Sequence, residues 1–144
     1  MPPSALRLDR FLCFSVYASN NAFGRLYKPL LDALDLTYAQ YLVMVVLWER
    51  DDRTVGEVGE ALALESNTLS PLLKRMEAAG LLGRTRDPGD ERQVRLRLTE
   101  KGLALRDRAE SIPACVFAAT GLGLAQVEQM VADLNRLRAA LAAP

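Results

Sequence analysis

The chain has 144 residues, half of them hydrophobic, and its 18 basic and 18 acidic side chains give a formal net charge of zero. This length fits one domain with a real core, and the balanced charge excludes indiscriminate binding to nucleic acids, so any DNA affinity must come from local charge and depend on salt. Histidine is absent, which excludes histidine-based triads and zinc sites, and we expect neither a bound metal nor a cofactor.

The first predicted helix starts near Leu6 and covers LRLDRFLCFSVYASNNAFGRLYKPLLDAL. Leu6, Arg10, Cys13 and Tyr17 are spaced three or four residues apart and therefore share one face. Phenylalanines widen the apolar coverage, so this helix is expected to pack against more than one neighbour, and a partner subunit would serve that purpose. Pro29 is expected to bend or break the helix near its end.

A second helix, YAQYLVMVVLWE, follows Thr37, which is expected to form a capping box with Gln40. Its strongly apolar sequence predicts burial, and Tyr41 and Trp48 are expected to belong to the core. Residues 49–53 carry five charged side chains in succession. We expect them to form a solvated loop.

The next two helices predict a helix-turn-helix between Thr54 and Gly80. Thr54 is expected to cap the first of them, with Glu57 completing a second capping box. The second has a polar start, an apolar stripe at helical spacing and a glycine stop at Gly80. The side chains expected to face a DNA groove are Ser66, Asn67, Thr68 and Ser70. The cations Lys74 and Arg75, toward the far end, are expected to contact phosphate or only to support the fold.

A hairpin pattern follows, with strands expected at 81–86 and 93–98 around the turn-forming run DPGDER. The second strand alternates apolar residues with Gln93, Arg95 and Arg97, which predicts a half-exposed strand with a basic face. A polar-tipped helix followed by a basic hairpin is typical of a winged helix-turn-helix, which places the helix in a major groove and the hairpin along the backbone. The wing contacts are expected from Arg84, Arg86, Arg95 and Arg92, and Arg92, near the tip, is expected to enter a minor groove.

The predicted helix and hairpin carry a net positive charge, although the whole chain is neutral. Between Ser66 and Arg97 there are seven basic and four acidic side chains, so the motif carries a surplus of three positive charges. Cations concentrated on one motif are expected of a phosphate-binding surface. The alternative is a helix and hairpin packed for stability, with ordinary solvated arginines.

Beyond the hairpin, Thr99 is expected to cap a helix from Glu100 into Ser111, with a break at Pro113. Cys115 lies in an apolar stretch, and a final helix with an apolar stripe follows the break at residues 121–123. The predicted fold is therefore mostly α with a small β-wing. It is a single domain, 1–144, in which 36–102 form the winged helix-turn-helix lobe and the terminal helices, 6–35 and 103–144, form a dimerisation region.

The expected location is the cytoplasm, without membrane contact. No apolar stretch reaches membrane-spanning length, and no charged leader precedes an apolar run. In such a setting two widely separated cysteines are expected to be free thiols or a redox pair rather than a structural disulfide.

The segment DERQVRLRLTEKG fits the wing signature of the MarR family, D-x-R followed by L-T-x-x-G, through Asp90, Arg92, Leu98, Thr99 and Gly102. The segments LDRFLCFSVYASN, YKPLLDALDLTYAQYLVMVVLWE and TLSPLLKRMEAAGLL resemble the organic-hydroperoxide-sensing branch, the OhrR repressors. The resemblance covers roughly residues 6–110, and the C-terminal helices match only in pattern. Asn67 stands where relatives often carry glycine. We expect this difference to change either which DNA bases the protein prefers or how the chain enters the helix.

This resemblance implies a homodimeric repressor of double-stranded operator DNA, not an enzyme. It also implies a second role for Arg92, which is to pair with Asp90 and shape the wing. It puts Cys13 at the position of the peroxide-reactive cysteine, and Tyr27 and Tyr38 at those of tyrosines that hydrogen-bond it across the dimer. Tyr17 is a further candidate near the thiol. Cys115 would be the resolving cysteine of a two-cysteine member, reaching Cys13 of the other subunit; the other interpretation is an apolar helix residue.

The implied mechanism begins when an organic hydroperoxide oxidises Cys13 to sulfenic acid and breaks its tyrosine hydrogen bonds. The sulfenic acid then condenses with Cys115 or with a low-molecular-weight thiol, the helices move, and DNA is released. Two alternatives remain open. One is a MarR-type repressor opened by a non-covalent phenolic or aromatic ligand; the other is a thiol peroxidase that uses Cys13.

Overall fold

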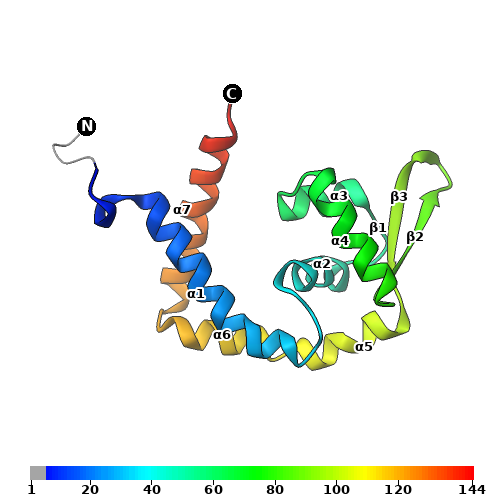
Figure 1. Cartoon of the computed structure of the whole chain (residues 1–144), viewed down its shortest axis with the longest axis horizontal. Helices are drawn as coiled ribbons and strands as arrows, with labels where there is room; N and C mark the ends of the chain where they lie inside the picture. Colours follow the sequence, from blue (N-terminus) through cyan, green and yellow to red (C-terminus); the bar gives the residue numbers. More distant parts are fainter. Residues whose placement is uncertain (1–5) are drawn as a thin grey trace. The chain divides into compact units, whose positions relative to one another are not determined.

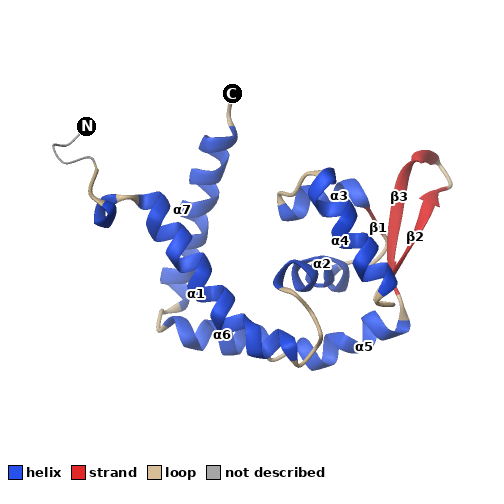
Figure 2. Cartoon of the chain, in the orientation of Figure 1, coloured by secondary structure: helices blue, strands red, loops and turns tan. Residues whose placement is uncertain are grey.

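A computed structural model describes residues 6–144 and divides the chain into two compact units, one ending at Glu110 and one formed by Ser111–Pro144. In chain order the first unit contains η1 (Leu8–Arg10), α1 (Leu12–Asp32), α2 (Tyr38–Glu49), β1 (Arg53–Thr54), α3 (Val55–Leu62), α4 (Ser66–Ala78), β2 (Leu82–Asp87), β3 (Asp90–Leu98) and α5 (Glu100–Ala109) (Figure 1). The second contains α6 (Ile112–Thr120) and α7 (Leu124–Ala142). Figure 2 shows a mostly helical chain with a small sheet, which confirms the predicted fold class.

The core of the first unit is built around α2. Its inward side chains include Val43 and Met44, which are completely buried. The apolar stripe of α4, which includes Leu69 and Met76, is also completely buried and faces this core. The predicted burial of both helices is confirmed, since helical spacing of apolar residues is a strong signal over a dozen positions.

Of the two predicted capping boxes, one is complete and one is half formed. Thr37 and Gln40 form the predicted capping box, with Gln40 N–H donating to Thr37 Oγ1 at 3.2 Å. Thr54 Oγ1 accepts from the Glu57 N–H at 3.1 Å, but the Glu57 carboxylate pairs with Arg50 at 3.0 Å. Only half of the second predicted capping box is present, because the nearby guanidinium offers the carboxylate a charged partner.

The sheet has the order β1-β3-β2, with both pairings antiparallel. Its hairpin turn is confined to residues 88–89, so the predicted longer turn is wrong: Asp90 and Arg92 already belong to β3. The predicted solvated loop at 49–53 is wrong at its end, where Arg53 pairs with Leu96 in β1. A two-residue strand is too short to leave an alternating pattern in the sequence.

The terminal helices differ from prediction at their boundaries. The α1 helix begins only at Leu12, after a 3₁₀ turn, and continues through Pro29 to Asp32. Pro113 lies in the first turn of α6 rather than at a break, because a first-turn residue needs no hydrogen-bonded N–H. Over residues 6–144, no single helix has the length and apolar character that a membrane crossing needs. One bent pair, Glu100–Thr120 with Leu124–Ala142, passes that test only when its halves are combined.

Candidate nucleic-acid interface and thiol site

The outer face of α4 presents the polar side chains singled out in the sequence. All of the following are exposed while the opposite face is buried: Ser66, Asn67, Thr68, Ser70, Lys74 and Arg75. The residue before the helix, Glu65, makes no side-chain cap. The Thr68 N–H donates to the Glu65 carbonyl at 3.1 Å, so the first-turn amides available to an anion such as a DNA phosphate are those of Ser66 and Asn67.

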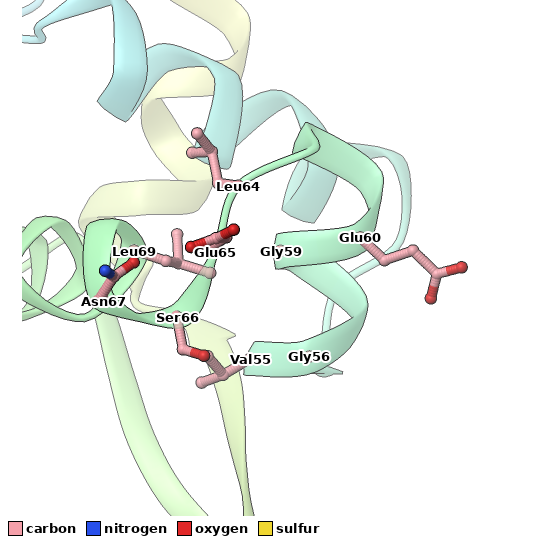
Figure 3. Close-up of a pocket in the computed structure, with 9 residues that line it drawn as sticks. All are labelled: Val55, Gly56, Gly59, Glu60, Leu64, Glu65, Ser66, Asn67 and Leu69. Atoms are coloured by element: carbon pink, nitrogen blue, oxygen red, sulfur yellow. The ribbon is translucent and has the colours of Figure 1, made fainter. Parts of the chain in front are cut away.

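A hollow of about 490 Å³ opens between α3 and α4 at the start of α4 (Figure 3). Ser66 and Asn67 line it together with Gly56 and Gly59 of α3. In Figure 3 the Glu60 side chain points away from the hollow, and Leu69 lies between the two helices. The first turn of α4 thus borders an open hollow, and its polar side chains are accessible.

The wing arginines are not equally available. Arg84 pairs with Glu77 of α4 at 3.1 Å, and Arg92 pairs with Asp90 at 3.1 Å, the second of the two roles considered for Arg92. Arg95 is held by Asp52 at 2.8 Å and Asp87 at 2.9 Å. Among the ion pairs within residues 6–144, none involves Lys74, Arg75 or Arg86. The predicted surplus of positive charge therefore lies on α4 and on the outer wing, meaning the exposed arginines Arg86 and Arg92 near the hairpin turn, rather than on the whole hairpin.

The ion pairs around Arg95 predict a loss of stability in acid. Hydrogen bonds from Arg95 are the main reason that the pKa values of Asp52 and Asp87 lie below the usual range. A lowered folded-state pKa contributes stability above the unfolded value, near ~3.9, and this contribution is lost as the pH falls through the folded pKa. We expect the unfolding temperature to fall more steeply below pH 4 in the wild type than in an Arg95→Met variant. Calorimetric scans from pH 6 to pH 2.5 measure this difference, and equal slopes would contradict it.

Both thiols are free and exposed. Cys13 lies in the first turn of α1, and Cys115 lies in α6 of the second unit. Around Cys13 the α1 surface is apolar and uncovered: Leu12 is 60% exposed and Tyr17 63% exposed. Tyr17 is one helical turn beyond Cys13 and shares its face. An exposed thiol amid uncovered apolar side chains is accessible to an apolar reactant.

Three phenols form a cluster between α1 and α2. The ring centroids of Tyr27 and Tyr38 are 4.8 Å apart, and that of Tyr41 lies 5.8 Å from Tyr27. Burial, followed by repulsion from Tyr38 and Tyr41, raises the pKa of Tyr27 to about 12. Burial also raises the pKa of Tyr41. Tyr27 therefore remains a neutral hydrogen-bond donor over the whole physiological range.

The clustered phenols Tyr27 and Tyr38 do not meet the Cys13 thiol of the same chain. Cys13 and Tyr27 both lie on α1, 14 residues apart, and a helix rises about 1.5 Å per residue, so about 21 Å separates them along the axis. Tyr38 contacts Tyr27 and is equally remote. Any contact of the Cys13 thiol with Tyr27 or Tyr38 must therefore come from a second copy of the chain.

Several contributors to this region were missed in the sequence. Asp52 holds two wing arginines, although its position suggested only a solvated loop. Trp48, expected in the core, is half-buried and donates its indole N–H to the Gly102 carbonyl at 2.9 Å. Tyr41 is buried as expected and also completes the phenol cluster. The partners of Asp52 and Trp48 are more than 40 residues away in sequence, so no local pattern could reveal them.

Comparison with known proteins identifies the family. Residues 25–108 match the family model of the transcriptional regulator SarA/Rot. The chain is 46% identical over 136 residues to the organic hydroperoxide resistance transcriptional regulator of Bacillus subtilis, covering 94% of this chain and 88% of that protein. It is 47% identical over 131 residues to the HTH-type transcriptional regulator TtmR of Methylorubrum extorquens, covering 91% of this chain and 67% of that protein.

A solved structure gives the same result for the fold. The reduced form of AbfR bound to DNA, a protein of Staphylococcus epidermidis, superposes with a TM-score of 0.79 at 34% identity and covers 94% of both chains. Its fold, like that of the present chain, combines helices with the small winged sheet described above. The chain belongs to the SarA/Rot and MarR-type winged-helix transcriptional regulators, in the branch of the organic hydroperoxide resistance regulators.

Proposed function

We propose that this regulator binds operator DNA as a homodimer and releases it when an organic hydroperoxide oxidises Cys13. The observation that carries the proposal is the exposed Cys13 thiol within the uncovered apolar face of α1. That surface admits an alkyl or lipid hydroperoxide, and a free thiolate is the nucleophile that the reaction needs. The 46% identity to a hydroperoxide resistance regulator supports the same conclusion.

A dimer follows from the surfaces left uncovered in one chain. Exposed large apolar side chains are concentrated on the terminal helices, on α1 at Leu12, Val16 and Phe23 and on α7 at Leu124, Met130, Val131, Leu134 and Leu141. Clustered apolar surface of this kind is typical of protein interfaces. A second copy of the chain also supplies the phenols that cannot reach Cys13 within one chain. Residues 6–35 and 103–144 are therefore proposed as the dimerisation region.

The chemistry is a two-electron oxidation. The Cys13 thiolate attacks the terminal oxygen of the hydroperoxide, the O–O bond breaks, and the sulfur becomes a sulfenic acid. The organic part leaves as an alkoxide, which takes a proton from water and becomes an alcohol. The sulfenic acid then condenses with a second thiol to form a disulfide and water. We propose Cys115 of the partner chain as that thiol, with a small cellular thiol as its substitute. One hydroperoxide is consumed per site, so the chain acts as a sensor and not as an enzyme.

On DNA, the proposed groove contacts are the exposed polar residues of α4, Ser66, Asn67, Thr68 and Ser70. Lys74, Arg75 and Arg86 have no carboxylate partner within residues 6–144 and are proposed to meet phosphates. Arg92 is 91% exposed despite its contact with Asp90 and extends the wing contacts. Arg84 is engaged by Glu77 and is proposed to support the wing rather than to bind DNA.

A Cys115→Ser protein tests the resolving thiol. We expect the peroxide-treated wild type to run as a crosslinked dimer on a non-reducing gel and to lose DNA affinity. The variant is expected to give no crosslink and to retain a sulfenic acid or a mixed disulfide, which dimedone labelling and mass spectrometry detect. A crosslink that persists in the variant would rule out Cys115 as the resolving residue. Failure of the wild type to release DNA would overturn the proposed function itself.

A further inference from the structure

The side chain of Arg95 lies on the face of the wing that is turned away from α4. In the central strand β3, Leu96 is completely buried, and its neighbour Arg95 points to the opposite face because successive strand residues alternate. The face toward α4 carries Arg84 and Arg92, which line a hollow of about 350 Å³ with Ser70 and Leu73 of α4. Arg95 therefore lies on the opposite side of the wing from the surface that faces α4.

Every nitrogen of the Arg95 guanidinium has a partner. Nε donates to Asp52 Oδ1 at 2.8 Å, Nη2 donates to the Asp52 carbonyl at 2.8 Å, and Nη1 donates to Asp87 Oδ2 at 2.9 Å. Asp52 immediately precedes β1, and Asp87 ends β2 at the hairpin turn. One side chain therefore connects all three strands, and only 25% of it is exposed.

The conformation of Asp52 fits this role. Its φ is +58°, a left-handed conformation that residues other than glycine rarely adopt. In this conformation both the carboxylate and the carbonyl of Asp52 accept hydrogen bonds from Arg95. The neighbouring Asp51 accepts the Leu98 N–H at 2.9 Å, which fixes the base of the same strand. The loop before β1 is thus shaped to hold the wing.

The charges of this cluster cancel. Arg95 and Arg97 face Asp52 and Asp87, and Arg97 contacts only Asp52, at 3.1 Å. Two cations and two carboxylates leave no surplus charge for a phosphate. A phosphate contact from Arg95 would require breaking charge-assisted hydrogen bonds that are already formed.

We propose that Arg95 is a positioning residue that sets the angle of the wing beside α4 and acts on DNA binding only through the outer residues Arg86 and Arg92. Outside this cluster the hairpin is held by the two-residue strand β1, by the buried side chains of Leu82 and Leu96 and by the Arg84–Glu77 ion pair. All of these act on the half of the hairpin away from its turn or on the face toward α4, and a two-stranded hairpin is weakly fixed by itself. Isolated surface ion pairs contribute little, but a network in which every donor is engaged is the exception. This inference rests on the DNA-binding part of the proposed function and not on its redox part.

The salt dependence of DNA binding distinguishes a residue that contacts phosphate from one that only positions the wing, because only a lost phosphate contact changes that dependence. A duplex selected by the wild-type protein from a random DNA library serves as the probe. We expect Arg95→Met to weaken binding roughly tenfold, within the range of networked charge pairs, and to leave the slope of log affinity against log salt unchanged. The outer-wing variant, Arg86→Ala with Arg92→Ala, is expected to lower that slope by about 0.9 per lost phosphate contact. A variant that combines Arg95→Met with both outer-wing changes should lose less affinity than the product of the two separate fold-losses.

Two further variants control the test. Asp87→Asn leaves the arginine in place and is expected to weaken binding with an unchanged slope, as Arg95→Met does. Arg97→Met also removes one positive charge from this face, but Arg97 does not contact Asp87, so the link to β2 stays intact. The affinity of this variant for the duplex is expected to stay within about twofold of that of the wild type. The proposal is overturned if Arg95→Met binds like the wild type, lowers the salt slope, or gives losses that multiply with those of the outer-wing variant. A wild type that selects no DNA would instead overturn the proposed function.

Discussion

A Cys13→Ser protein is expected to bind operator DNA with the wild-type dissociation constant and to stay bound when cumene hydroperoxide is added. Serine has nearly the same shape, and Cys13 is exposed, so neither the fold nor the DNA-binding face should change. Coupling between two sites in one protein typically changes affinity about 5- to 150-fold. Wild-type affinity should fall within that range after peroxide treatment, while that of the variant should change by less than about twofold.

The same experiment separates the alternatives. A repressor opened by a non-covalent aromatic ligand would treat Cys13→Ser and wild type alike, because the ligand needs no thiol. A peroxidase would turn over many equivalents of hydroperoxide when a thiol reductant is supplied, whereas a sensor consumes one equivalent per site. Release of DNA from the serine variant on peroxide treatment would show that another residue is the sensor.

Mixed dimers show whether the site is built from two chains. In a dimer of one Cys13→Ser chain and one Tyr27→Phe chain, the intact thiol of one chain would face the intact phenol of the other. The 21 Å or so between Cys13 and Tyr27 on a single α1 helix makes this the expected arrangement. Such a mixture should retain one fast-reacting site with wild-type kinetics. A mixture as slow as Tyr27→Phe alone would place thiol and phenol in the same chain.

The recognition helix was predictable because its signals are local. The stripe of α4 repeats at helical spacing over several turns, Thr37 and Gln40 are three residues apart, and Gly80 has a φ of +76° that explains its place at the helix end. The exposure of the α4 polar face follows directly from that stripe, since the opposite side of an amphipathic helix must face solvent.

The orientation of the wing faces was not predictable from the sequence. Period-two alternation revealed that one face of β3 is basic, but not which face is turned toward α4. The partner of Arg95 is Asp52, 43 residues earlier in the sequence and within a run that resembles any solvated loop. Pairing across that distance is set by the antiparallel contact of β1 with β3, and β1 is too short to be recognised. The count of charges gave the surplus of three but not which of the cations are paired with carboxylates.

The glycine of the wing signature is explained by close packing of the backbone. A Cβ built on Gly102 would lie 2.2 Å from the Leu81 carbonyl oxygen, a separation that no rotamer change can relieve because the obstacle is backbone. Around this point Thr99 Oγ1 donates to the Gly80 carbonyl at 2.5 Å, and Trp48 donates to the Gly102 carbonyl at 2.9 Å. The start of α5 is thus held against both the end of α4 and the interior helix α2.

Replacing Gly102 with alanine is therefore expected to lower the free energy of unfolding by about 3 kcal/mol. The helix propensity of alanine would favour the variant by only about 1 kcal/mol, so the steric effect decides the sign. Gly83→Ala is the matched control, because nothing lies within 4 Å of a Cβ at that strand position; it should be neutral or stabilise by up to about 1 kcal/mol. Urea unfolding followed through the single tryptophan, Trp48, measures both variants. Equal stability of the two variants would mean that α5 can move away from Leu81 at little cost. Close packing against the Leu81 carbonyl would then not explain the glycine of the signature.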